Sequence, residues 1–190
     1  WQNSVFFNVP YDDDYEPLLV AMMSAAVASG LAPRAAVEIP SPGTRLDKII
    51  ALIESCRSSI HDLSPPRGEV RYNMPFELGI AFQVALRGGR HFPIVLETKA
   101  FRLHRTLSDV NGIDAVVHDG TQRGAIQAIL DSFPLAIGGP SYQDVEGLVR
   151  QVRKDLKLLK KQEARTSIYN PQMWNKTVAL IAQLATARGL

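Results

Sequence analysis

Residues 45–63 read RLDKIIALIESCRSSIHDL, and the apolar pattern changes its period within this stretch. The first part carries four aliphatic residues at the spacing of one helix face: Leu46, Ile49, Ile50 and Ile53. This spacing predicts an amphipathic helix over residues 45–56. The run SIHDL at 59–63 predicts a short buried strand. A helix that leads directly into such a strand is typical of α/β proteins.

The same alternation continues on both sides of this stretch. Apolar runs predict further strands at residues 4–9, 35–39, 92–97 and 113–118. Helical patterns lie between or after them, at residues 16–29, 74–86, 105–110 and 124–132. Five strands separated by helices predict a parallel sheet that is covered on both faces. We therefore expect an α/β, flavodoxin-like, doubly wound five-stranded sheet of order 2-1-3-4-5 with a C-terminal helical extension.

Composition excludes several classes of protein. The chain has 190 residues, 46% of them hydrophobic, and its single cysteine excludes an internal disulfide and multi-cysteine zinc sites. No run of about 18 apolar residues predicts a membrane span. The N-terminus has no basic segment followed by an apolar one, so we read no signal peptide. A cytoplasmic location is the expectation.

The net charge of +2 conceals two oppositely charged parts. Residues 1–140 carry 12 Lys/Arg against 15 Asp/Glu, whereas residues 141–190 carry 9 against 4. We predict an α/β domain over 1–137 and a basic helical extension over 138–190, which packs on the sheet or on another subunit. We expect the basic face of this helix to be exposed to solvent. The alternative is that it binds an acidic surface of a second subunit or a nucleic-acid backbone.

The predicted fold also locates a crevice. In a doubly wound sheet, ligands bind beyond the carboxyl ends of the strands where the strand order reverses. Three segments meet there: residues 8–15 (NVPYDDDY), 61–64 (HDLS) and 72–79 (YNMPFELG). Asn73 is a predicted N-cap, and Glu77 falls in the same first turn, where the helix dipole favours an ionised carboxylate. Asp62 ends a buried strand and needs a partner or water.

Several common catalytic motifs are missing from the sequence. It contains no G-x-G-x-x-G, no G-x-x-x-x-G-K-[ST] and no G-x-S-x-G. The histidines, at 61, 91, 104 and 118, form no H-E-x-x-H pair. We therefore assign no metal and no cofactor.

Three stretches resemble the superfamily that unites nucleoside 2-deoxyribosyltransferases with TIR domains. They are VFFNVPYDDDY at 5–15, IIALIESCRSSIHDLS at 49–64 and YNMPFELGIA at 72–81. In the transferases a strand that ends in Asp precedes a helix with a Glu-Leu-Gly-x-Ala-like opening, and this Glu is the nucleophile. The matching residues here are Asp62 and Glu77. TIR domains show a comparable progression, with a catalytic Glu in members that cleave NAD.

The resemblance, which covers about residues 4–133, implies an N-glycosidase or an N-ribosyl or deoxyribosyl transferase. Its substrate would be a nucleoside, a nucleotide or NAD, with NAD as substrate rather than cofactor, and a homo-oligomer is expected. Glu77 would stabilise or capture the sugar cation, and Asp62 would protonate or orient the base or hold ribose hydroxyls. The candidate substrate contacts are Asn8, Tyr11 and Asn73 for ribose or phosphate, Phe7 and Met74 for the base, and Gly79 for close approach.

Two other functions are open to such a sequence. A non-catalytic TIR-like nucleotide-sensing or protein-interaction module would use the same fold without turnover. A phosphorylation receiver would use Asp12–Asp14 and Asp62, but it needs a Lys at the end of strand five, where this chain has His118-Asp119-Gly120. The second of these is therefore the weaker reading.

Overall fold

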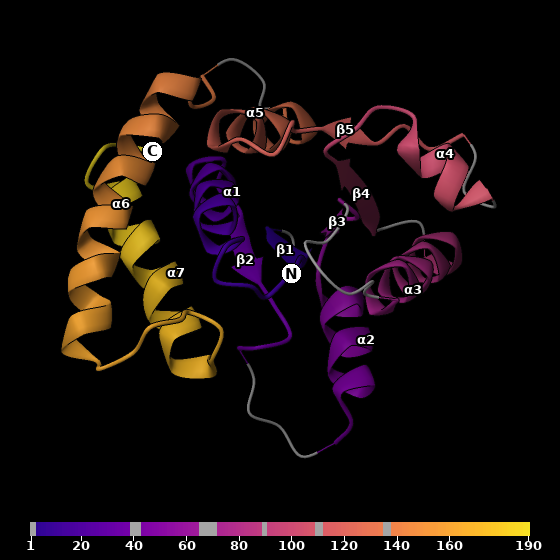
Figure 1. Ribbon diagram of the computed structural model, residues 1–190, viewed down its shortest axis with the longest axis horizontal. Helices are drawn as coiled ribbons and strands as arrows, with labels where there is room; N and C mark the ends of the chain where they lie inside the picture. Colours follow the sequence, from indigo (N-terminus) through magenta and orange to yellow (C-terminus); the bar gives the residue numbers. More distant parts are fainter. Residues whose placement is uncertain (1–2, 39–42, 65–71, 89–90, 109–111, 135–137) are drawn as a thin grey trace.

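The computed structural model describes residues 3–38, 43–64, 72–88, 91–108, 112–134 and 138–190. Its centre is a parallel sheet of order β2-β1-β3-β4-β5, which confirms the predicted fold class (Figure 1). The strands are β1 (Ser4–Asn8), β2 (Ala32–Arg34), β3 (Ser58–Asp62), β4 (Phe92–Glu97) and β5 (Val116–Val117). The helices are α1 (Glu16–Ala28), α2 (Arg45–Ser55), α3 (Asn73–Gly88), α4 (Arg102–Thr106), α5 (Gln122–Ser132), α6 (Tyr142–Gln162) and α7 (Pro171–Thr186).

The sheet separates two apolar layers because side chains alternate along each strand. On β1, Val5 and Phe7 point into the layer under α1 and α5, while Phe6 packs against α2 and α3. Phe7 is fully buried in this core. Phe7 therefore lies beneath α1 and is not exposed. The sequence had suggested it as a contact for the base, and its burial does not fit that role.

Two elements lie earlier in the chain than their patterns predicted. β2 covers Ala32–Arg34 instead of residues 35–39, because the carboxylate of Glu38 accepts hydrogen bonds from Arg34 Nε at 2.5 Å and Ala35 N at 3.3 Å. These bonds close a turn directly after Arg34. Pro33 is tolerated because β2 is an edge strand. Residue 39 lies outside the described residues.

The second shift concerns α4, which covers Arg102–Thr106 instead of residues 105–110, of which 109 and 110 lie outside the described residues. Arg102 begins this helix and donates to the carbonyl oxygen of Leu63 at 2.6 Å. The helix is therefore held against the end of β3. β5 is also shorter than predicted: only Val116–Val117 pairs with β4.

The C-terminal helices share a core with the sheet. α6 and α7 pack on the side of α1 that faces away from the sheet (Figure 1). Their buried side chains belong to the same cluster as β1 and α1, and they include Val145, Leu148, Val149, Val152, Met173 and Trp174. This arrangement explains why α1 is apolar on all sides: the sheet covers one side and the C-terminal helices cover the other.

The basic face of α6 points outward. Arg150, Arg153, Lys154, Lys157 and Lys161 are exposed. Lys160 is the exception, because its ammonium group bridges the Glu16 carboxylate at 2.5 Å and the carbonyl oxygen of Thr166 at 2.7 Å. Within the described residues, no helix has the length and apolar character needed to cross a membrane.

Candidate active site

The carboxyl ends of β1, β3 and β4 place three polar side chains along one edge of the sheet. Asn8 ends β1, Asp62 ends β3 and Glu97 ends β4. All three are at most 3% exposed. A cavity of about 300 Å³ opens beside them, and the residues around it include Asp62, Ser64, Tyr72, Met74 and Arg102. The crevice predicted from the strand order is therefore present.

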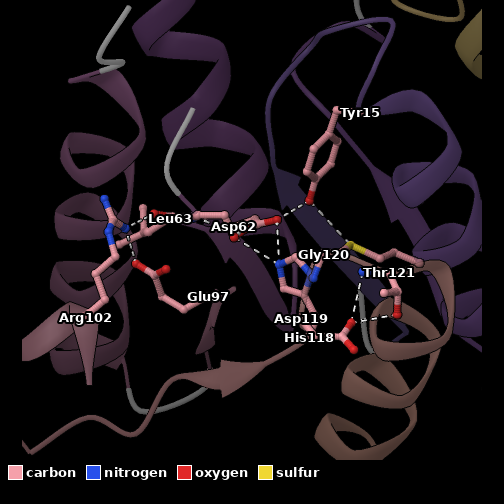
Figure 2. Close-up of polar contacts among 11 residues, drawn as sticks. Tyr15, Asp62, Leu63, Glu97, Arg102, His118, Asp119, Gly120 and Thr121 are labelled. Atoms are coloured by element: carbon pink, nitrogen blue, oxygen red, sulfur yellow. Dashed lines mark hydrogen bonds and ion pairs between the residues drawn. The ribbon is translucent and has the colours of Figure 1, made fainter. Parts of the chain in front are cut away.

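Asp62 lies at the centre of a dense hydrogen-bond cluster (Figure 2). One carboxylate oxygen accepts from the Tyr15 hydroxyl and from His118 Nε2 at 3.1 Å. The other accepts from the backbone N–H of Ser64 at 2.9 Å and from its hydroxyl. Burial works to raise the pKa of Asp62, yet the hydrogen bond and attraction of His118, followed by the hydroxyl donors, hold it below its usual value. Asp62 is thus an ionised carboxylate whose charge is already well compensated.

Tyr15 is a hydrogen-bond donor to this carboxylate. Burial, and then the charge of Asp62, raise the pKa of Tyr15 well above its usual value. The phenol therefore keeps its proton and donates a hydrogen bond to Asp62.

His118 orders the other side of the cluster. The backbone N–H of Gly120 donates to Nδ1 of His118 at 3.3 Å, so the ring proton sits on Nε2, which faces Asp62. Ser64 Oγ lies 3.0 Å from the same Nε2. A serine nucleophile needs an unprotonated histidine nitrogen as its base, and here that nitrogen already carries a proton. The cluster contains Ser, His and Asp, but it is not a hydrolase triad.

A tight turn between β5 and α5 holds His118 in place. Asp119 adopts a left-handed conformation with φ of 52°, and its carboxylate accepts from Thr121 N at 2.9 Å and Thr121 Oγ1 at 2.6 Å. Gly124 packs directly on this turn: a Cβ there would lie 2.0 Å from the carbonyl oxygen of His118. Only glycine fits this approach without displacing the backbone of His118.

Glu77 has a very different environment from that of Asp62. It is 5% exposed, and its one described hydrogen bond is a long contact of 3.4 Å from Asn73 Nδ2. Burial raises the pKa of Glu77, while Asn73 and the charge of Arg45 oppose that rise. The Glu77 charge is therefore poorly compensated in the resting protein.

Tyr11 lies near Glu77, whose charge acts on its phenol. Burial and the nearby Glu77 charge raise the pKa of Tyr11, so its phenol stays protonated at neutral pH. The guanidinium carbon of Arg45 lies 5.9 Å from the centre of the Tyr11 ring. Tyr11, Arg45 and Glu77 thus form a mixed polar group between β1, α2 and α3.

The start of α3 differs from the prediction. Asn73 is the first residue of the helix, not its N-cap, and the first helical turn contains no acidic residue. Glu77 consequently lies one turn further along, where the helix dipole is weaker. Its electrostatic state comes mainly from burial, and this raises the pKa, whereas a first-turn position would lower it.

The structure divides the predicted site residues between two groups, and Glu77 is not among the described residues that line the cavity. Asp62 and Met74 line the cavity, and Asn8 donates from Nδ2 to the carbonyl oxygen of Met74 at 3.1 Å. Tyr11 and Glu77 belong to the mixed polar group with Arg45, and Asn73 adjoins it through its long hydrogen bond to Glu77. Gly79 is placed elsewhere, on the exposed side of α3, where it borders a groove between α2 and α3.

The sequence did not single out five residues of this edge: Tyr15, Ser64, Glu97, Arg102 and His118. Glu97 could have been found, because it ends a predicted strand as Asp62 does. It is fully buried and paired with Arg102, and burial raises its pKa against the effect of that arginine. Its second oxygen has no hydrogen-bond partner within the described part of the chain. That part also contains no cluster of three His, Cys, Asp or Glu side chains suited to a metal ion.

No protein-family model matches the chain, and no curated protein matches it. Among solved structures, the chain is similar to a 2-desoxiribosyltransferase from Leishmania mexicana, with 19% sequence identity and a TM-score of 0.43. The match covers 62% of this chain and 75% of the other.

Proposed function

We propose that this protein cleaves the N-glycosidic bond of a nucleoside, a nucleotide or NAD, with Glu77 as the group that stabilises or captures the sugar. The observation that carries the proposal is the contrast between two buried carboxylates, Asp62 at the end of β3 and Glu77 in α3. Within the described residues, Asp62 receives four donor contacts, from Tyr15, Ser64 and His118, whereas Glu77 receives one long hydrogen bond from Asn73.

This contrast supports a catalytic role for Glu77. Cleavage of the C1′–N bond leaves its electron pair on the base and positive charge on C1′ and the ring oxygen. A carboxylate whose charge few donors compensate gains the most when a cation forms beside it. An oxygen of Glu77 can then bond to C1′, and water or a second base can displace it in the next step.

Asp62 suits a supporting role. Its lowered pKa keeps it ionised, so it has no proton for a departing base. It can instead fix Tyr15, Ser64 and His118 around the cavity, and it can accept a hydrogen bond from a substrate hydroxyl. Tyr72 and Met74 supply apolar surface on the wall of the same cavity. The cavity of about 300 Å³ can hold one part of a nucleoside, such as its base or its sugar.

The test measures, by chromatography, the release of base from a panel of nucleosides, nucleotides and NAD. Glu77→Gln is nearly isosteric but cannot bond covalently through a carboxylate oxygen, so the rate is expected to fall about 10³-fold. Glu54→Gln, at an exposed position of α2, is the matched control and should keep full activity. Base release that persists in Glu77→Gln would contradict the proposal, as would wild-type protein that binds these compounds and releases no base.

A further inference from the structure

A continuous line of buried hydrogen bonds runs along β3, on the face that α2 and α3 cover. We call it the buried chain; its members are Asn8, His61, Ser59 and His91. Asn8 Nδ2 lies 2.9 Å from His61 Nδ1, His61 Nε2 lies 2.7 Å from Ser59 Oγ, and Ser59 Oγ lies 2.8 Å from His91 Nε2. All four residues are at most 7% exposed. They connect the carboxyl edge of the sheet, where the crevice lies, to its amino edge.

Both ends of the buried chain are backbone carbonyl oxygens, which can only accept hydrogen bonds. At the amino edge, His91 Nδ1 lies 2.9 Å from the carbonyl oxygen of Cys56. At the crevice, Asn8 Nδ2 donates to the carbonyl oxygen of Met74 at 3.1 Å. These two fixed acceptors determine the direction of every bond between them.

The assignment proceeds from the amino edge. His91 must carry its proton on Nδ1, so in the neutral ring Nε2 accepts from the Ser59 hydroxyl. Ser59 then accepts from His61 Nε2–H, and His61 Nδ1 is left as an acceptor for the Asn8 amide. The two amide hydrogens of Asn8 are thereby both used, one by His61 and one by Met74. Every N–H and O–H hydrogen along the buried chain thus has one acceptor.

The surroundings of the two rings favour their neutral forms. Burial lowers the pKa of His91, although its bond to the Cys56 carbonyl opposes this, and burial together with His91 lowers the pKa of His61 to about 3. Among the described residues, Glu54 of α2 and Arg87 of α3 line the same groove as His91, and Arg34 and Glu38 act on Cys56 beside it. Carbonyl acceptors at both ends and neutral rings between them are therefore mutually consistent.

We propose that His61, Ser59 and His91 are positioning residues that hold the Asn8 amide on the Met74 carbonyl, and through it the first turn of α3 that leads to Glu77. The effect of this positioning on catalysis rests on the proposed function, but the positioning itself does not. Met74 is the second residue of α3, and Glu77 follows it within one turn. A change at Ser59 should thus reach Glu77 although Ser59 touches neither the cavity nor the carboxylate.

The chain offers a matched pair of variants for the test. Ser59→Ala removes the central link of the buried chain, whereas the hydroxyl of the adjacent Ser58 is equally buried and has no hydrogen-bond partner in the described structure. Ser58→Ala therefore removes an unused hydroxyl from the same strand. Imidazole nitrogen NMR is the first measurement and needs no variant. Wild-type protein at neutral pH should show His61 protonated on Nε2 and His91 protonated on Nδ1, and the opposite form of either ring overturns the proposal.

The second measurement is the titration of the Glu77 carboxyl carbon by NMR. Its midpoint should shift in Ser59→Ala and stay at the wild-type value in Ser58→Ala; an unchanged midpoint in Ser59→Ala overturns the proposal. If base release is established, Ser59→Ala should also lower kcat by about tenfold or more, because small displacements of a reacting group are costly. A failure of the proposed function removes only this kinetic arm, and the two NMR measurements still decide the positioning.

Discussion

Acidification should destabilise this fold through His61, which is fully buried. The pKa of His61 is lowered from 6.5 to about 3 by burial and by His91. The unfolded chain takes up a proton at this side chain near pH 6.5, and the folded chain does not. The stability that the neutral ring contributes is therefore fully present above that pH and is lost as the pH falls from 6.5 toward 3.

The magnitude follows from the two pKa values. Between pH 7 and pH 5 the unfolded state becomes almost fully protonated at His61 and the folded state stays neutral, which removes about 2 kcal/mol of unfolding free energy. This is a large fraction of the roughly 5–15 kcal/mol that stabilises a typical domain. His91 acts in the same direction, whereas the raised pKa values of Glu77 and Glu97 act in the opposite direction.

Because other groups contribute, the diagnostic quantity is a difference between two proteins. Urea unfolding at pH 7 and pH 5 should show that the loss of stability is smaller in His61→Gln than in wild type by about 2 kcal/mol. Gln keeps a donor that can reach Ser59 but cannot take up a proton. Equal losses in the two proteins would refute the reasoning. So would a His61 ring proton resonance in wild-type protein that titrates between pH 5 and pH 7, a measurement that does not depend on the variant folding.

Two further predictions concern packing around the site and in the C-terminal helices. Gly124→Ala should lower the free energy of unfolding by about 2 kcal/mol or more, because its Cβ would meet the His118 carbonyl oxygen at 2.0 Å. Gly79→Ala has nothing within 4 Å of its Cβ and should raise the free energy of unfolding by about 0.5–1 kcal/mol. Thermal unfolding of the two variants checks the direction of both changes in stability. A Gly124→Ala protein as stable as wild type would contradict the role of that contact. Trp174→Ala should cost about 3–5 kcal/mol because the indole is fully buried in the core shared with α1, whereas Leu158→Ala, at 54% exposure, should cost little. A single unfolding transition in chemical denaturation, shifted as a whole by Trp174→Ala, is expected; two separate transitions would show that the C-terminal helices unfold independently of the sheet.

The positions of single elements show where sequence reasoning succeeds. The helix α2 and the strands β1, β3 and β4 lie within about two residues of their predicted ends, because each has a clear apolar period of its own. β2 was misplaced since its boundary depends on the Glu38 carboxylate, which closes a turn after Arg34. α4 was misplaced since Arg102 is held by the carbonyl oxygen of Leu63, which is 39 positions away in the sequence.

The sequence likewise predicted some features of the candidate site and missed others. Strand order alone located the crevice and drew attention to Asp62 and Glu77, because residues at the ends of parallel strands must meet at one edge. It did not show that the Glu77 pKa is raised by burial, since a first-turn position implied the reverse. It also did not find His118, whose approach to Asp62 depends on the turn after β5.

What the sequence by itself determined is the class of fold, the order of the strands and the edge at which polar groups gather, because local apolar periods carry that information. What only the tertiary structure decided is which carboxylate is compensated and in which direction the buried hydrogen bonds run. Tyr15 reaches Asp62 across 47 positions, and Asn8 reaches His61 across 53. The charge and proton position of a buried group depend on such distant neighbours and on the water they exclude, and no local pattern records them.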